Sequence, residues 1–252
     1  MMVFMLLFLS ALGIGQARDA QLASRLVTEG LGLAEQGRHE EAAARFRMAT
    51  QADPKTVDAH NNLGVTLRRR KDFRGAAAAF QAALRIRQKD ARIHSNVALA
   101  FRGIGRLDDA LASMKKACSL EPRHATMRRN LGILLSEPGN QEQAGKELRR
   151  AVELDPTSPE THRLLASLLA ASKRAEEAIE EYRAALRLDS QQPAVHYEIG
   201  RLHEANGDLQ HATEEYRMAV NLEDNYFEAH KALGGVSLGL GDLSRQRGIR
   251  AS

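Results

Sequence analysis

The chain has 252 residues, a formal net charge of +4, 43% hydrophobic and 27% charged residues, and no tryptophan. This composition is typical of a folded helical protein and excludes a disordered or membrane-embedded chain. The 36 basic residues are balanced by 32 acidic ones, which argues against nucleic-acid binding.

The first 17 residues differ from all that follow. Residues 1–15 contain no charge and a single polar side chain, Ser10, and the first charged residue is Arg18. An apolar run that ends in small residues predicts a secretory signal peptide cleaved after Ala17. The alternative is an uncleaved membrane anchor at 1–17, although a membrane span needs about 20 apolar residues. We therefore expect a secreted or periplasmic protein that contacts a membrane only if this segment is retained.

Alanine then recurs with a strict period. Two ladders advance in steps of 34 residues: Ala42, Ala76, Ala110, Ala144, Ala178, Ala212 and Ala49, Ala83, Ala117, Ala151, Ala185, Ala219. Such a period indicates one small unit built repeatedly, in which each copy buries its apolar face against its neighbours. The units start at residues 23, 57, 91, 125, 159 and 193, and a partial seventh starts at 227.

Each unit is predicted to be two antiparallel helices joined by a short turn. In the second unit Leu63 and Leu67 have helical spacing, and Ala76 and Phe80 resume it after a break. The turn carries a residue suited to positive φ, and its six occupants are Gly37, Lys71, Gly105, Gly139, Lys173 and Gly207. Small residues of the first helix mark the expected close helix contacts: Gly30, Gly64, Ala98, Gly132, Ala166, Gly200 and Gly234. Large fillers of the second helix are predicted to be core: Phe46, Phe80, Met114, Leu148, Tyr182 and Tyr216.

The pattern resembles the tetratricopeptide repeat (TPR) family. The motif stands here as Leu63-Gly64, Ala76, Phe80 and Ala83, with Pro54 or Pro122 at the end of a repeat. The resemblance implies an all-α fold, an α-solenoid in which six helix-turn-helix repeats and a partial seventh form a right-handed superhelix. It covers residues 23–240 and leaves 241–252 as a C-terminal tail.

A row of histidines invites a metal hypothesis. His60, His94, His162, His196 and His230 share one repeat position, and Arg128 fills it in the remaining repeat. Successive repeats are separated by at least the roughly 8–10 Å of one helix contact, whereas zinc ligands all lie about 2 Å from one ion. We therefore expect no metal site in this row, and no cofactor. The chain also lacks a nucleophile elbow, a phosphate-binding loop and a CxxC pair, so we expect no enzyme.

The candidate binding residues lie on the first helices. Asn62, Asn96 and Asn130 are 34 residues apart. The ladder resembles that of the TPR array of the transferase that attaches N-acetylglucosamine to Ser and Thr, which implies a concave groove that binds a peptide backbone. A carboxamide suits this role because it offers both a donor and an acceptor. The alternative is that asparagine is simply the consensus at this position.

Arginines are expected beside this ladder. By the resemblance they lie on or near the same concave surface: Arg68, Arg69, Arg92, Arg102, Arg129, Arg163 and Arg201. Guanidinium groups there would favour carboxylates, although several could instead pair with neighbouring glutamates. The chaperone-type carboxylate clamp of the family is not matched, because Val27 or Asn61 occupies the place of its first lysine.

The leading functional hypothesis is a non-enzymatic scaffold that binds a segment of a protein or peptide partner, possibly an acidic one, in this groove. One alternative is a bacterial envelope or pilus assembly factor, because pilotins resemble the chain in size and in having a signal followed by about six repeats. Those are lipoproteins, however, and no cysteine follows the apolar run here. A weaker alternative is the repeat portion associated with a transferase.

Overall fold

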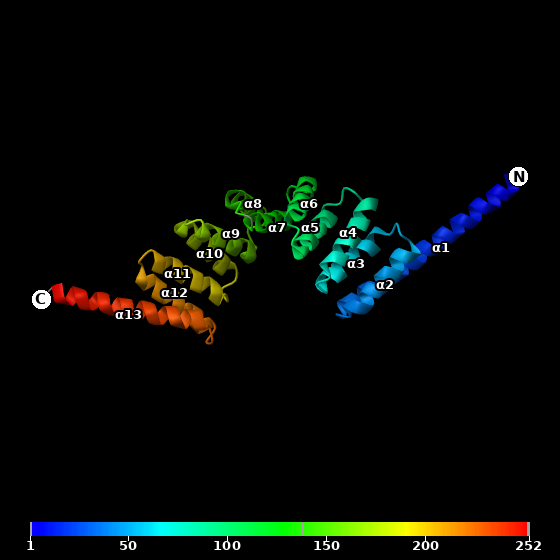
Figure 1. Cartoon of the computed structure of the whole chain (residues 1–252). Helices are drawn as coiled ribbons and strands as arrows, with labels where there is room; N and C mark the ends of the chain where they lie inside the picture. Colours follow the sequence, from blue (N-terminus) through cyan, green and yellow to red (C-terminus); the bar gives the residue numbers. More distant parts are fainter. Residues whose placement is uncertain (1, 138, 251–252) are drawn as a thin grey trace. The chain divides into compact units, whose positions relative to one another are not determined.

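The protein is all-helical in the part that the structure describes. The computed structural model describes residues 2–137 and 139–250, with side chains at 19–137 and 139–239. Within these ranges the chain forms thirteen α-helices and no strand (Figure 1), which confirms the predicted all-α solenoid. The helices are α1 (Met2–Glu35), α2 (His39–Ala52), α3 (Val57–Arg69), α4 (Phe73–Ile86), α5 (Ala91–Ile104), α6 (Leu107–Leu120), α7 (Ala125–Ser136), α8 (Gln141–Leu154), α9 (Pro159–Ala171), α10 (Ala175–Leu188), α11 (Pro193–Ala205), α12 (Leu209–Leu222) and α13 (Phe227–Arg250).

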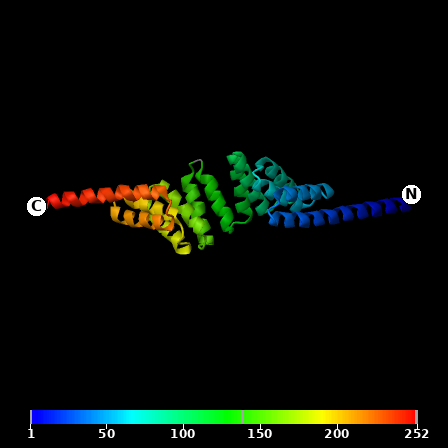
Figure 2. The same cartoon turned by 90° about the horizontal axis from the view of Figure 1, so that it is seen from below.

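Each helix packs on its neighbours in the chain. The chain divides into two units, Met1–Leu134 and Leu135–Ser252. In the first unit α1 packs on α2, α3 on α4 and α5 on α6, while α2 contacts α3 and α4 contacts α5 across the repeat boundaries. In the second unit α9 pairs with α10 and α11 with α12, and Figure 2 shows α13 lying beside α12 as the next layer. Every repeat is thus stabilised by the one before and after it.

The starts of the first helices follow the 34-residue period. Helices α3, α5, α7, α9, α11 and α13 begin at the residues with which the predicted units start. Helix α1 instead begins at Met2 and runs through residue 23 without a break. Helix α13 continues to Arg250, through most of the segment expected as a tail.

The N-terminal prediction falls outside what the structure describes. The signal peptide or anchor at 1–17 consists of residues whose side chains are not described. Among the described residues, none of the helices combines the length and apolarity that crossing a membrane requires.

The turn inside each repeat has one backbone form. All four glycines at the turn position have φ between 76° and 84°, and Lys71 and Lys173 adopt the same left-handed region at 63° and 60°. The residue after the turn position donates its N–H to the carbonyl five residues earlier, as Arg106 does to Phe101 and Asp208 to His203, both at 2.9 Å. This is the Schellman closure of a helix. It holds the last turn of the first helix against the start of the second.

The two alanine ladders are buried, as predicted. Every member is at most 1% exposed. The small residue of the first helix faces the filler of the second, because a Cβ on Gly64 would lie 2.6 Å from Phe80 and one on Gly200 would lie 2.6 Å from Tyr216. Where the small residue is Ala98, the filler is the more adaptable Met114. Close helix approach therefore requires glycine opposite these aromatic rings.

The histidine row ties the repeats together. The Nε2–H of His60 donates to the Pro54 carbonyl at 3.0 Å, and His94 donates to Gln88 at the same distance. Arg128, which replaces histidine in the fourth repeat, donates from Nε to the Pro122 carbonyl at 3.1 Å. Each of these side chains hydrogen-bonds the turn that enters its own helix. The row has a structural function in these repeats.

Candidate functional site

The asparagine ladder lies in the first unit. Asn62 is on α3, Asn96 on α5 and Asn130 on α7, and all three are half-buried. The Asn96 Nδ2 donates to Asn61 Oδ1 at 3.2 Å, so carboxamides of adjacent repeats are joined. This bond uses one donor and one acceptor position, and each carboxamide keeps others for a ligand.

A hollow of about 300 Å³ opens where α3 faces α5. It is lined by Val57, Asp58, Asn61, Asn62, Arg87, Asp90, Arg92, Ile93 and Asn96. Arg87 pairs with Asp90 at 3.4 Å, and Asp90 also accepts from the backbone N–H of Arg92 as the N-cap of α5. The Arg92 guanidinium is exposed and has no ion-pair partner among the described residues. Two cations and two anions line the hollow, and one of the cations is available to a ligand.

A second hollow lies against the same helix. It measures about 310 Å³ and is lined by Leu31, Ala34, Glu35, His39, Phe46, Asn62, Val65, Thr66 and Arg69. Asn62 lines both hollows, so they adjoin along α3. Together they place two predicted asparagines between two predicted arginines, Arg69 and Arg92.

The other predicted arginines of a hollow belong to the second unit. Arg163 and Arg201 line a hollow of about 570 Å³ together with Leu164, Tyr182 and Glu198. Leu164 and Glu198 occupy the ladder position one and two repeats after Asn130, so the asparagines are not continued here. Arg201 pairs with Glu198 at 3.2 Å, which is the pairing that the sequence left open. Burial and the charge of Glu198 raise the pKa of the Tyr182 phenol to about 12.

Four predicted residues line none of these three hollows. Asn130 and Arg129 are half-buried on α7, Arg102 is exposed at the end of α5, and Arg68 is half-buried on α3. The structure adds Asn61, Asp58 and Asp90, which the sequence analysis did not select. Asn61 precedes a ladder residue, so the Asn61-Asn62 pair was the available signal.

Three family models match the chain. Two are described as tetratricopeptide repeat, over residues 27–91 and 104–168, and one as TPR repeat, over 166–207. The protein belongs to the tetratricopeptide repeat family. This fold is generally a scaffold for protein–protein interaction, its members bind protein or peptide partners, and they are typically not enzymes. No curated protein sequence matches the chain.

Solved structures share the fold at low identity. PilF from Pseudomonas aeruginosa is 21% identical with a TM-score of 0.71, covering 84% of this chain and 97% of its own. YrrB, described as a TPR protein with an unusual peptide-binding site, is 19% identical with a TM-score of 0.63, covering 74% and 96%. MamA from Desulfovibrio magneticus RS-1 is 20% identical with a TM-score of 0.63, covering 68% and 97%. These similarities are similarities of fold.

Proposed function

We propose that the protein is a non-enzymatic scaffold that binds an extended segment of a partner protein over α3 and α5. The observation that supports this most is the pair of linked carboxamides, Asn61 and Asn96, at a hollow that Asn62 also lines. Carboxamides at repeated positions can pair with successive peptide groups without reading the side chains of the ligand. The repeat separation carries these groups along the path of an extended chain.

The charges favour a ligand with acidic groups at its ends. Arg92 and Arg69 lie on either side of Asn62, one in each hollow. The guanidinium of Arg69, like that of Arg92, is exposed and has no ion pair within the described part of the chain. A guanidinium binds a carboxylate through two parallel hydrogen bonds. Asp58 in the first hollow and Glu35 in the second limit this preference, because an acidic residue beside them is repelled.

The test uses peptides selected from a random display library against the wild-type chain. Their affinity is then measured by fluorescence polarisation on the Arg92→Ala/Asn96→Ala variant. A matched control, Gln81→Ala/Arg85→Ala, removes one carboxamide and one guanidinium from the exposed side of α4. We expect the first variant to bind at least about tenfold more weakly, which is about 1.4 kcal/mol. The control should bind like the wild type.

Two outcomes would contradict the proposal. Equal affinity in the wild type and the Arg92→Ala/Asn96→Ala variant would remove these residues from the binding surface. Loss of binding in the control variant alone would place the partner on α4. Circular dichroism of both variants confirms that any loss does not come from unfolding.

We also propose that the protein is exported, on the basis of the apolar segment at 1–17. Mass spectrometry of the mature protein from the expressing cell should find an N-terminus after Ala17. A retained Met1 would contradict cleavage and would favour the anchor.

A further inference from the structure

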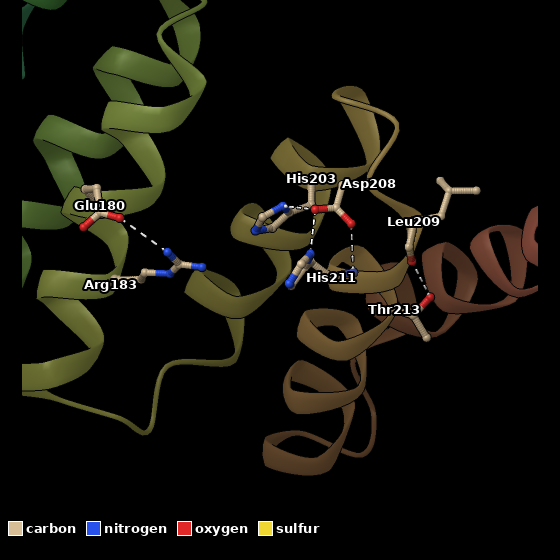
Figure 3. A network of polar contacts seen from close by, with 7 residues as sticks. All are labelled: Glu180, Arg183, His203, Asp208, Leu209, His211 and Thr213. Atoms are coloured by element: carbon tan, nitrogen blue, oxygen red, sulfur yellow. Dashed lines mark hydrogen bonds and ion pairs between the residues drawn. The ribbon is translucent and has the colours of Figure 1, made fainter.

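The turn of the sixth repeat brings three metal-binding side chains together. His203 lies in the last turn of α11, Asp208 is the N-cap of α12, and His211 is in the first turn of α12. One ligand atom from each lies within 4.8 Å of the other two. The Asp208 Oδ2 is 2.6 Å from His211 Nδ1 and 3.3 Å from His203 Nδ1, and Figure 3 shows both rings turned toward the carboxylate.

The backbone of the turn makes this convergence. The Schellman bond from the Asp208 N–H to the His203 carbonyl, at 2.9 Å, joins the two helix ends. The Asp208 carboxylate accepts from the backbone N–H of His211, which fixes the cap against the first turn of α12. The ring planes of His203 and His211 stack with centroids 5.2 Å apart.

His203 departs from the repeat. The same position is a large hydrophobic residue in the other five repeats, namely Leu33, Leu67, Phe101, Leu135 and Leu169. The His203 side chain is only 13% exposed, and its Nε2 is buried without a hydrogen-bond partner. Packing alone favours leucine there, because a buried polar nitrogen without a partner is destabilising. A histidine at this position therefore needs another reason.

The position of His211 also changes in this repeat. Its equivalents in the first, third and fifth repeats are Glu41, Asp109 and Glu177, each paired with the arginine that precedes the helix. In the sixth repeat the cap is the acid and the third residue is the base. Both departures meet at Asp208, so the turn carries two imidazoles and one carboxylate.

We propose that His203, Asp208 and His211 bind one divalent transition-metal ion of the zinc class. Imidazole and carboxylate are donors that such ions accept, and three protein ligands leave a fourth position for water or for a group of a partner. Ligands about 2.0–2.2 Å from a tetrahedral ion lie about 3.3–3.6 Å from one another. The His203–Asp208 separation already has this value, and the exposed His211 ring needs to move back by about 1 Å. The site is separate from the histidine row and from the hollows on α3.

The test is calorimetric titration of zinc chloride into the metal-free full chain, carrying no polyhistidine tag. Two variants remove one ligand each. His203→Leu installs the residue type of the other repeats and is expected to fold, and His211→Gln changes an exposed side chain. The control is His94→Gln, because the His94 ring only donates to the Gln88 carbonyl. All four proteins contain the remaining histidines, so nonspecific binding is the same in each.

We expect one zinc ion per wild-type chain, and weakening of at least about tenfold in both ligand variants, since loss of even an outer-shell partner costs about 10–100-fold. His94→Gln should bind like the wild type. Zinc should also raise the unfolding temperature of the wild type and of His94→Gln but not of His203→Leu, because a ligand stabilises only the state that binds it. Wild-type affinity in His203→Leu, or no zinc binding by the wild type, would overturn the proposal.

Discussion

The turns of the third and sixth repeats have the same backbone and different chemistry. In the third, the Arg106 guanidinium lies 4.6 Å from the Phe101 ring centroid and its Nε is 2.7 Å from Asp109. In the sixth, the equivalent residues are Asp208, His203 and His211. Both turns close with the same 2.9 Å bond between main-chain atoms. The repeat thus supplies a fixed frame, and the side chains at three positions decide whether it holds a structural contact or a group of metal-binding donors.

The hollows repeat the contrast. In the first unit the ladder position carries Asn62 and Asn96, whereas in the second it carries Leu164 and Glu198. The frame of helix pairs is the same, but the donors and acceptors that could hold a peptide backbone are found in the first unit. Departures from the repeat, more than the repeat itself, therefore direct the search for function.

The largest expected effect comes from exchanging the residues of one turn position. Leu169 is 4% exposed, and Leu169→His should lower the free energy of unfolding by about 2–5 kcal/mol, because apolar contacts are lost and a polar ring is buried. His203→Leu, in metal-free buffer, should change it by less than about 1 kcal/mol or raise it. Urea unfolding followed by circular dichroism measures both. Equal losses in the two variants would mean that the sixth turn is packed around histidine.

Next in size is the contrast between a crowded and an open glycine. A Cβ on Gly64 would lie 2.6 Å from Phe80, so Gly64→Ala should destabilise by about 1–3 kcal/mol. Gly32 has no atom within 4 Å of its Cβ position, and Gly32→Ala should stabilise α1 by about 0.5–1 kcal/mol. Thermal unfolding of the pair should therefore shift in opposite directions. A gain in both would show that the first helix can move away from Phe80.

The filler position predicts sensitivity to alkali. The pKa of Tyr182 is raised to about 12, so the unfolded chain loses this proton near pH 10 while the folded chain keeps it. Stability is then fully present below about pH 10 and falls by on the order of 2 kcal/mol as the pH rises toward 12. Unfolding at several pH values should show a smaller loss in Tyr182→Phe. An identical pH profile in the variant would assign the alkaline loss to other groups.

The smallest expected effect concerns the turn residues with positive φ. Lys71→Gly and Lys173→Gly should each stabilise the chain by about 1 kcal/mol, because a side chain is strained in the left-handed region and glycine is not. The reverse change, Gly105→Lys, should destabilise by a similar amount. Thermal unfolding distinguishes the three. No gain from either lysine replacement would indicate that the lysine side chains make compensating contacts.

The sequence alone predicted the fold because burial repeats with the chain. Alanines at 34-residue spacing and a turn residue suited to positive φ require little knowledge of three-dimensional contacts. The hollow beside Asn62 was only partly predictable, since Asn61 and Asp90 belong to it through side-chain orientation across two repeats. The three donors of the sixth turn were missed because the analysis compared histidines at one repeat position. Histidine in place of leucine at His203 was the signal that could have revealed them.

The most direct test of this comparison is an anomalous difference map from crystals of the full chain soaked in zinc, recorded at the zinc absorption edge. We expect one strong peak between His203, Asp208 and His211, and none at the equivalent turn around Phe101 and Arg106. A map without a peak in the sixth turn, or with its strongest peak on the His60 and His94 row, would contradict the assignment of metal chemistry to that departure from the repeat.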